Sequence, residues 1–389
     1  MTMTMPGLRV ALLAGGLTQG GAEKQLVYMA GALQREGAHV RVYSLTRGDH
    51  YEAALEAIGL PPVWIGRVGN PAARVAAWAR ALRGFSPHLL QAGHFFANLY
   101  VALVAPLYRA AGIGSIRSDV YQEMEANGRW GPALYRMPGS LIANSHAAVQ
   151  NAAALGFPTG KIEVLPNVID VAAFDREAAC APPRSAGEGT VVIAACRLVA
   201  AKRVDRLLRA IAIARKTASS LRGLIVGEGP EGPALRQLAR ELGLLPDAVA
   251  FAGRRSDVAA LMRGADIAAL TSDHEGFPNV VLEAMAAGLP VVTTRTGDAG
   301  VIVEDGVTGY VVDGDPVEAV ARKLLLLASD RPLRERLGGA GRAKIVGRYS
   351  VDALGGMMLA TYTAIAARTR HVRLAAALAP NAGTAGGIA

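Results

Sequence analysis

The chain has 389 residues, which is too long for one ordinary hydrophobic core and suits two domains of about 150 to 200 residues. Hydrophobic residues make up 51% of it and charged residues 19%, a balance that excludes an intrinsically disordered chain. The formal charge of +9 fits either a solvated basic surface or anionic partners such as phosphate ligands or an anionic membrane face, whereas an aromatic content of only 5% argues against nucleic acid.

The first half of the chain alternates short apolar runs, Gly-rich turns and segments of helical period. Helices are expected between the strands, for example at Ala22–Glu36 and Ala72–Leu82. This alternation is typical of a parallel sheet covered by helices on both faces. The predicted strands are Arg9–Leu13, His39–Ser44, Pro62–Ile65, His88–Gln91, Gly114–Arg117, Leu141–Ala143 and Ile162–Leu165.

Residues 178–189 are small and rich in Pro and Gly, so they are predicted to link a first domain at 1–177 to a second domain at 190–350. The same alternation restarts after this linker. We therefore expect an α/β protein with two Rossmann-like, doubly wound domains that face each other across a cleft and bind ligands beyond the carboxyl ends of their strands. The predicted strands of the second domain are Val191–Ala195, Gly223–Val226, Val249–Phe251, Ile267–Leu270 and Pro290–Thr293.

The end of the chain is predicted to be helical from about Pro316 to Arg368. Within it, residues 351–370 are expected to form a C-terminal helix that can cross back to the first domain. Residues 371–389 are rich in small side chains and are expected to form a disordered tail.

The two cysteines, Cys180 and Cys196, form no Cys-x-x-Cys pair. The sequence therefore predicts neither a disulfide framework nor a zinc site and favours a reducing compartment. The longest apolar run, Leu99–Leu107, is short and contains a proline, so no segment is expected to span a bilayer.

Two acids, Glu275 and Glu283, follow the predicted strand Ile267–Leu270 with seven residues between them. Pro278 lies where a helix would begin, so the turn before it offers backbone N–H groups at a helix N-terminus, where phosphates and hydroxyls bind well. One carboxylate would precede that terminus and the other would lie inside the helix. From the spacing alone, a capping acid followed by a surface glutamate remains the alternative.

Two cations, Arg197 and Lys202, follow the predicted strand Val191–Ala195 at a strand-to-helix turn. Such a pair can converge on a diphosphate. Because cations oppose the dipole at a helix N-terminus, their position favours an anionic ligand over an incidental placement. Gly227, which follows Gly223–Val226, would allow a ligand to approach the backbone closely, although this signal is weak alone.

A Gly-rich loop, Gly15 to Glu23, connects the first strand to the first helix and contains Gly20 and Gly21. It has neither the Gly-x-Gly-x-x-Gly spacing of a dinucleotide fold nor the Gly-Lys-Ser/Thr end of a P-loop. His94 follows one predicted strand of the same half, and Arg117 closes the next, at the sheet edge where ligands bind. A lone histidine at a strand end is more often structural, so both roles stay open for His94.

The segment Asp313-Gly-Asp315 has the spacing of a metal-binding Asp-x-Asp pair. It directly precedes the helix predicted from Pro316, and Asp and Gly favour turns and helix caps. We therefore expect a turn at this position and no metal site.

Taken together, these segments resemble glycosyltransferase family 4, a group of retaining enzymes with the GT-B fold, and the resemblance covers nearly the whole chain. Its most specific part is Glu275-x7-Glu283, where Glu283 opens the segment Glu-Ala-Met-Ala-Ala-Gly-Leu-Pro. The resemblance also includes Gly20-Gly21-Ala-Glu23, the basic pair and Phe251-Ala-Gly253. In Leu165–Asp170, Val168 replaces the glycine that is common in the family.

The resemblance implies a role for each residue. Arg197 and Lys202 would stabilise charge on the departing diphosphate, and Glu283 would bind the ribose hydroxyls. Glu275 would position the donor sugar, and with His94 and the basic pair it would carry catalysis. No metal or other cofactor is implied. The remaining donor-binding residues would be Gly20, Gly21, Gly227, Gly253, Gly276, Phe277, Asn279 and Val280, and the acceptor side would include His94 and Arg117.

The implied substrates are a nucleotide-sugar donor, with a UDP-sugar favoured over a GDP-sugar, and a glycan or lipid-linked acceptor of bacterial cell-surface polysaccharide synthesis. Residues 115–119 resemble members that build such polymers. The expected location is cytoplasmic, and the helix Arg74–Arg83 with Trp78 could contact the inner membrane face, with a packing helix as the stronger alternative. A nucleotide-sugar 2-epimerase and a non-catalytic nucleotide-sugar binding protein are the alternative functions.

Overall fold

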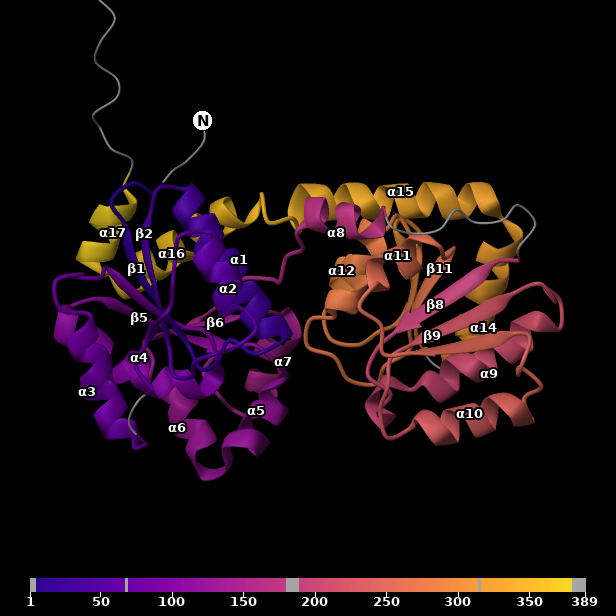
Figure 1. Cartoon of the computed structure of the whole chain (residues 1–389), viewed down its shortest axis with the longest axis horizontal. Coiled ribbons are helices and arrows are strands. Elements are labelled where there is room, and N and C mark those ends of the chain that lie inside the picture. Colours follow the sequence, from indigo (N-terminus) through magenta and orange to yellow (C-terminus); the bar gives the residue numbers. More distant parts are fainter. Residues whose placement is uncertain (1–4, 67–68, 180–188, 314–315, 380–389) are drawn as a thin grey trace, which may run out of the picture. The chain divides into compact units, whose positions relative to one another are not determined.

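The computed structural model describes residues 5–66, 69–179, 189–313 and 316–379. Their contacts divide the chain into two compact α/β domains (Figure 1). The first domain comprises the chain up to Val168 together with the chain from Val351 onward, and the second domain comprises Ile169–Ser350.

Parallel strands build the sheet of the first domain. The described strands are β1 (Arg9–Ala14), β2 (His39–Ser44), β3 (Val63–Trp64), β4 (Leu89–Ala92), β5 (Ala111–Ile116), β6 (Ser140–Ala143) and β7 (Ile162–Val164). They lie in the order β3-β2-β1-β4-β5-β6-β7. The order reverses between β1 and β4, and in such sheets ligands bind beyond the carboxyl ends of the strands at this point.

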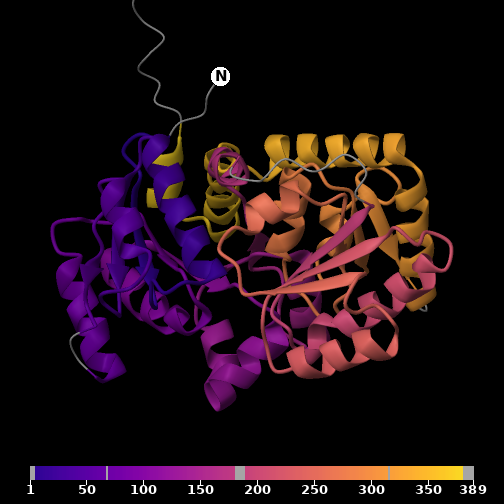
Figure 2. The same ribbon diagram turned by 45° about the vertical axis from the view of Figure 1, so that its right-hand side comes forward.

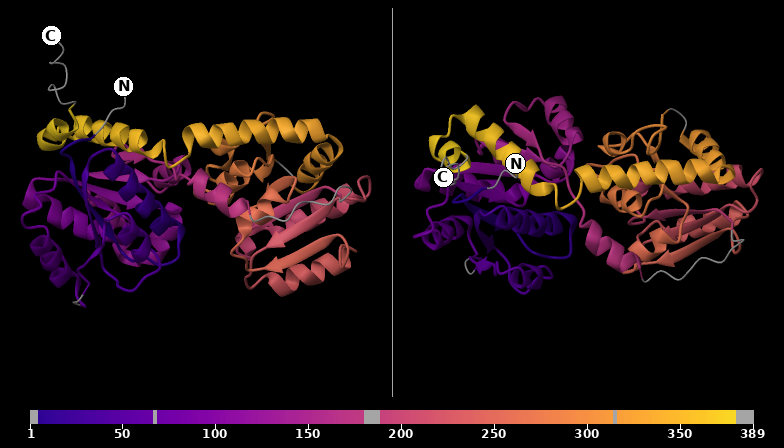
Figure 3. Two further views of the ribbon diagram at one scale, coloured as in Figure 1. Left: turned by 45° about the horizontal axis from the view of Figure 1, so that its top comes forward. Right: turned by 90° about the horizontal axis from the view of Figure 1, so that it is seen from above.

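Helices cover both faces of this sheet, which explains why β4 and β6 are buried along their whole length. One core contains side chains of α1, α2, α16 and α17, and Figure 3 shows α16 (yellow) in this domain. Further cores contain α3 with α4, and α5 with α6 and α7. The helices are α1 (Gly21–Arg35), α2 (Glu52–Ala57), α3 (Pro71–Ala81), η1 (Phe95–Ala97), α4 (Asn98–Val104), η2 (Ala105–Tyr108), α5 (Val120–Asn127), η3 (Gly128–Trp130), α6 (Gly131–Arg136), α7 (His146–Ala154), α16 (Leu354–Thr369) and α17 (Val372–Leu378).

The second domain repeats the same architecture. Its described strands are β8 (Val191–Ala195), β9 (Arg222–Val226), β10 (Val249–Gly253), β11 (Ile267–Leu270), β12 (Val291–Thr294) and β13 (Gly309–Val312). They form a parallel sheet in the order β10-β9-β8-β11-β12-β13. The order therefore reverses between β8 and β11, which predicts the position of a ligand site at their carboxyl ends.

Two hydrophobic cores lie on the two faces of the second sheet. One contains α9, α10 and α14, and the other contains α8, α11, α12, α13 and α15. Figure 2 shows α9 and α10 on one face of the sheet and α15 on the other. The helices are α8 (Val171–Ala178), η4 (Ala200–Lys202), α9 (Val204–Arg215), α10 (Gly232–Glu241), α11 (Val258–Arg263), α12 (Asn279–Ala286), α13 (Ala299–Ile302), α14 (Pro316–Ser329) and α15 (Arg331–Arg348).

The chain passes from the first to the second domain between Val168 and Ile169, and not at residues 178–189 as the sequence predicted. Helix α8 belongs to the second domain because Phe174 packs into its core and Asp175 binds Arg342 at 2.6 Å. The Pro- and Gly-rich composition marks the connection between α8 and β8, of which residues 180–188 lie outside the described part.

The C-terminal helix α16 packs on α1 of the first domain, as expected. The prediction of a disordered tail from residue 371 is wrong for Val372–Leu378, which form α17. Leu374 is fully buried in the core of the first domain, and this burial holds the helix in place. Residues 380–389 lie outside the described part. In the described residues, no helix combines the length and hydropathy needed to cross a membrane.

Two further expectations need correction. Strand β13 was not predicted. Its four residues lie between a turn and a helix, and so short a pattern does not distinguish a strand from a loop. Trp78, proposed to contact a membrane from α3, is fully buried and packs edge-on against Tyr43. Helix α3 is therefore a packing helix, which was the stronger alternative.

Candidate functional site

An ion pair lies at the carboxyl ends of β8 and β11, where the order of the second sheet reverses. The Nζ of Lys202 donates to Oε1 of Glu275 at 2.6 Å, and the Oγ of Ser272 donates to the same oxygen at 2.7 Å. The side chains of Lys202 and Glu275 are only 24% and 10% exposed. Folding therefore brings together two segments that the sequence singled out separately, the basic pair and the first acid.

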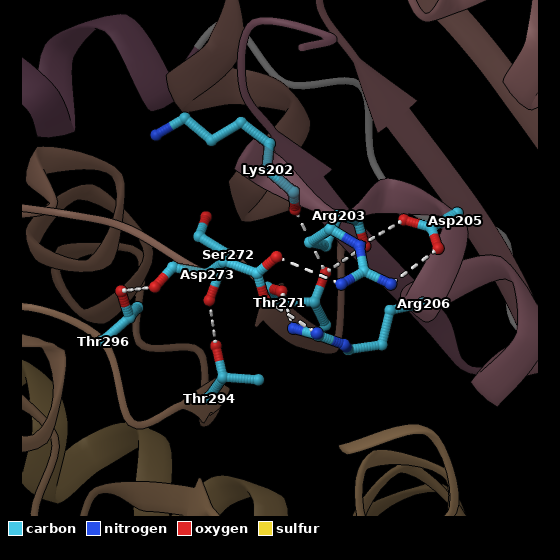
Figure 4. A network of polar contacts seen from close by, with 9 residues as sticks. All are labelled: Lys202, Arg203, Asp205, Arg206, Thr271, Ser272, Asp273, Thr294 and Thr296. Atoms are coloured by element: carbon cyan, nitrogen blue, oxygen red, sulfur yellow. Dashed lines mark hydrogen bonds and ion pairs between the residues drawn. The ribbon is translucent and has the colours of Figure 1, made fainter. Parts of the chain in front are cut away.

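A network of polar contacts around Asp273 fixes the loop that follows β11 (Figure 4). The guanidinium of Arg206 donates to the carbonyl of Thr271 at 2.7 Å and to Oδ1 of Asp273 at 2.8 Å. The hydroxyl of Thr294 donates to the carbonyl of Ser272 at 2.7 Å. Burial acts to raise the pKa of Asp273, but hydrogen bonds from Arg206 and Arg203 outweigh it and lower the pKa.

A pocket of about 610 Å³ opens at the carboxyl ends of β8, β9 and β10. Four predicted residues line it: Arg197, Gly227, Val280 and Glu283. The guanidinium of Arg197 is exposed and forms no hydrogen bond or ion pair within the described residues, so it is available to an anion. The other lining residues are Ala195, Cys196, Val226, Glu228, Gly229, Arg254, Arg255 and Val258.

Glycine is required at one wall of this pocket. Gly227 has φ +130°, and a Cβ there would lie 1.9 Å from the carbonyl oxygen of Cys196. Gly253, the last residue of β10, has φ +68°. Burial raises the pKa of the Cys196 thiol to about 11, so the thiol stays protonated at neutral pH and lines the pocket without acting as a nucleophile.

The turn from β11 into α12 carries the remaining predicted donor residues. The carbonyl of Gly276 accepts a hydrogen bond from the backbone of Asp298 at 3.0 Å. Phe277 is buried and packs near Tyr349, with ring centroids 6.1 Å apart, so only its backbone can serve a ligand. Pro278 is the N-cap residue of α12.

Helix α12 places its acid as expected. Asn279 is its first residue, and Glu283 lies one turn later and lines the pocket together with Val280. The two acids thus differ in surroundings. Glu275 precedes α12 and is held by Lys202 and Ser272. Glu283 lies within α12 and lines the pocket.

A second cluster lies in the first domain, at the carboxyl ends of β1 and β4. The backbone N–H of Gly15 donates to Nδ1 of His94 at 3.0 Å, so the neutral ring carries its proton on Nε2. That Nε2 lies 3.3 Å from Oε1 of Glu23. Gly20 makes room for this acid, because a Cβ there would lie 2.2 Å from Oε2 of Glu23. Gly21 begins α1.

Arg117 is the first residue after β5 in the same domain. Within the described residues its Nε is buried without a hydrogen-bond partner, and its Nη2 donates to the sulfur of Met29 at 3.8 Å. Burial lowers the pKa of Arg117 to about 10, which leaves the guanidinium charged at neutral pH.

The Asp-x-Asp segment lies only partly in the described residues, because Asp315 falls outside them. Asp313 binds Arg295 through both carboxylate oxygens, at 2.7 and 3.0 Å, and both side chains are 61% exposed. The described ranges contain no group of three or more His, Cys, Asp or Glu side chains that could hold a metal ion.

Sequence reasoning missed several residues that the structure adds to these sites. Arg254 and Arg255 line the pocket directly after β10, and their position beyond a strand end could have marked them. Ser272 and Glu23 hold Glu275 and His94. The contact of Glu23 with His94 spans the fold, whereas Ser272 contacts Glu275 within one turn of chain. No sequence pattern distinguishes either residue from ordinary helix and turn residues.

Two family profiles match the chain. The profile described as glycosyl transferases group 1 matches residues 175–344, and the profile described as glycosyltransferase family 4 matches residues 19–173. A GDP-mannose-dependent alpha-(1-6)-phosphatidylinositol monomannoside mannosyltransferase of Mycobacterium tuberculosis is 31% identical over 296 residues, 71% of this chain and 76% of that protein. The lipopolysaccharide core biosynthesis glycosyltransferase LpsE of Rhizobium meliloti is 30% identical over 57% of this chain and 63% of its own length.

Solved structures resemble the fold. The crystal structure of Anabaena HepE in complex with UDP and glucose has a TM-score of 0.75 at 23% identity, and the match covers 92% of this chain and 100% of that one. This likeness confirms the fold expected from the sequence, with two α/β domains of the GT-B type.

Proposed function

The chain belongs to glycosyltransferase family 4, and from this premise we propose that it moves a sugar from a nucleotide-diphosphate sugar to a glycan or lipid-linked saccharide with retention of the anomeric configuration. The observation that carries this proposal is the Lys202–Glu275 pair, which lies at the reversal of the strand order. Arg197 and Glu283 line the pocket at the same edge of the sheet.

The diphosphate of the donor is held by Arg197 and Lys202. Arg197 is unpaired within the described residues, and the ammonium of Lys202 has three N–H donors, so it can bind a phosphate oxygen while it stays bonded to Glu275. As the bond from the anomeric carbon to the diphosphate breaks, negative charge grows on the leaving oxygen. These two cations stabilise that charge in place of a metal ion.

The two acids bind hydroxyl groups. Glu275, fixed by Lys202 and Ser272, orients the donor sugar, and Glu283 accepts hydrogen bonds from the ribose. The acceptor oxygen forms its bond on the face that the diphosphate leaves, and its proton passes to an oxygen of the leaving phosphate. Neither carboxylate is therefore needed as a general base.

The substrate class rests on the relatives. HepE was solved with UDP and glucose, which favours a UDP-sugar donor, while the mycobacterial relative is named for GDP-mannose. LpsE is named for lipopolysaccharide core biosynthesis, which supports an acceptor in cell-surface polysaccharide synthesis. We place the reaction in the cytoplasm, with peripheral contact to the inner membrane face as part of the same proposal.

Thermal unfolding of the purified chain with UDP, GDP, ADP and their sugars tests the donor assignment. A nucleotide at a hundred times its Kd stabilises the folded state by about 2.7 kcal/mol, so the correct base raises the Tm most. NMR of the product from an α-linked donor is then expected to show an α-linkage. A β-linked product would contradict retention, and a free C2-epimerised sugar without acceptor would favour the epimerase.

A further inference from the structure

We propose that the first domain binds a negatively charged group of the acceptor saccharide, a phosphate or a carboxylate, at Arg117. The inference rests on the proposed function, because it takes the ligand of this domain to be the acceptor. It adds the chemical class of that acceptor. Arg117 follows β5, the neighbour of β4, at the sheet edge that also carries His94.

The guanidinium of Arg117 lacks the partners that a buried cation needs. Its Nε is buried without a hydrogen bond, and its Nη2 has only the sulfur of Met29 at 3.8 Å, a weak acceptor. No carboxylate within the described residues forms an ion pair with it. Arg206 of the second domain shows how a buried arginine is usually paired, because its guanidinium donates to a carbonyl oxygen and to the carboxylate of Asp273.

The groups around Arg117 do not supply the missing negative charge. Burial raises the pKa of the Tyr362 phenol, which stays protonated and donates to Oε1 of Gln91 at 2.6 Å. The carboxylate of Glu123 accepts a hydrogen bond from the Ser118 hydroxyl at 2.7 Å and forms no ion pair with the Arg117 guanidinium. The Nε of Arg117 is buried, but the residue as a whole is only partly buried, so an anion would approach it from its exposed part.

Asn144, which contacts the backbone of Arg117, carries a second buried atom without a hydrogen-bond partner in the described residues. The Nδ2 of Asn144, just after β6, donates to the carbonyl oxygen of Arg117 at 2.9 Å, which fixes the orientation of the amide. Its Oδ1 is buried and accepts no hydrogen bond within the described residues. The guanidinium of Arg117 is thus a cation without a counter-charge, and a phosphate or carboxylate of a saccharide would supply that charge.

Titration calorimetry of the full chain tests this inference with glucose 6-phosphate, glucuronate and neutral glucose as probes. Saturating UDP is present in every titration so that the donor pocket is filled. We expect the wild type to bind at least one anionic probe about tenfold or more tightly than glucose. Arg117→Met removes this preference, whereas Arg83→Met, which removes an exposed charge of the same domain, retains it.

Unfolding separates this role from a structural one. Because Arg117→Met removes a buried unpaired charge at nearly constant volume, its Tm is expected to equal or exceed that of the wild type. A Tm several degrees lower would overturn the claim that the guanidinium lacks a partner. Arg117→Lys keeps the charge without the fork and is expected to retain part of the preference.

The remaining outcomes are distinct. The inference would be overturned if glucose and both anionic probes bind with equal affinity, or if Arg117→Met binds the anionic probes as tightly as the wild type. In either case, binding of UDP would leave the proposed function standing. Preference for glucose 6-phosphate supports a phosphate, and preference for glucuronate supports a carboxylate. Failure of UDP and every other nucleotide to bind would instead contradict the proposed function.

Discussion

Lys202 and Arg197 follow the same strand, but their side chains differ in what they contact. Lys202 is paired with Glu275, whereas Arg197 is exposed and has no side-chain partner in the described residues. The pair holds the carboxylate of Glu275 in place before a ligand arrives. Such preorganised charge costs no rearrangement when the diphosphate leaves, which is the main source of electrostatic catalysis.

Replacement of this lysine tests the assignment. Lys202→Met is expected to lower kcat about 10² to 10³-fold, because a preorganised charge at the leaving group is lost. The rate of transfer from the donor and the Tm are to be measured together. Lys216→Met, at an exposed position after α9, serves as the control with wild-type turnover. Wild-type turnover by folded Lys202→Met would refute the diphosphate assignment.

The histidine of the first domain depends on Glu23. Glu23→Ala is expected to lower kcat about tenfold or more while the affinity for UDP stays unchanged, because the nucleotide pocket lies in the second domain. Nitrogen-15 NMR of His94 is expected to change at Nε2, the atom that loses its partner. Glu56→Ala, an exposed residue of α2, is the control. Unaltered kcat and an unaltered His94 spectrum would show that the pair has no positioning role.

At the scale of elements, loops are held by side chains from other helices and strands. The loop after β11 is fixed by Arg206 from α9 and by Thr294 from β12. Helix α8 is held by Asp170, which caps it through the N–H of Ala173 at 2.8 Å, and by the ion pair of Asp175 with Arg342. These contacts position the site residues more tightly than the loop sequences could alone.

The pairing of Asp273 makes the stability of the second domain pH-dependent. Its folded pKa is lowered, so its contribution is present above its unfolded value of about 3.9 and is lost as the pH falls through the folded value. Asp273→Asn is expected to cost about 1 kcal/mol at pH 7, discounted because the side chain is 39% exposed. Thermal unfolding is to be measured between pH 7 and pH 3. The Tm difference between Asp273→Asn and the wild type is expected to shrink as the pH falls.

A surface ion pair provides the control for that experiment. Asp257 binds Arg255 on an exposed loop, where solvent screens the interaction. Asp257→Asn is therefore expected to change the Tm less than Asp273→Asn at pH 7. An equal effect of both substitutions on the Tm would mean that the hydrogen-bond network around Asp273 adds no stability of its own.

At the scale of the whole molecule, the two domains carry different parts of the proposed reaction. The pocket proposed to bind the nucleotide lies in the second domain, and His94, Glu23 and Arg117 lie in the first. The pocket of the second domain lies at the carboxyl edge where the strand order of its sheet reverses. In the first domain His94 follows β4, at the corresponding reversal, and Arg117 follows the neighbouring strand β5. Both doubly wound sheets thus present functional side chains at their carboxyl edges.

The neutralisation of the diphosphate by side chains predicts transfer without a metal ion. Activity of the full chain is expected to survive a chelator such as EDTA, because Arg197 and Lys202 supply the positive charge. Initial rates with and without chelator provide the measurement. Complete loss of activity that manganese restores would contradict this mechanism and return attention to the Asp313–Asp315 segment.

The amino-acid sequence by itself determined the alternation of strands and helices, the presence of two α/β domains and the residues of the family motif. Strands such as His39–Ser44 and Ile267–Leu270 have the predicted bounds because their apolar runs and flanking turns are local signals. Glu283 and Arg197 were found for a related reason. Arg197 lies just beyond the end of β8, which can be recognised locally, and Glu283 lies at a fixed spacing from Glu275 in the family motif.

Only the tertiary structure decided which residues meet. The placement of α8 in the second domain, the ordering of α17 by Leu374, the pairing of Lys202 with Glu275 and the unsatisfied guanidinium of Arg117 all depend on residues far apart in the chain. Such contacts arise from packing, which no local pattern encodes. For the same reason Trp78, which stood out as a candidate membrane contact, lies in a hydrophobic core.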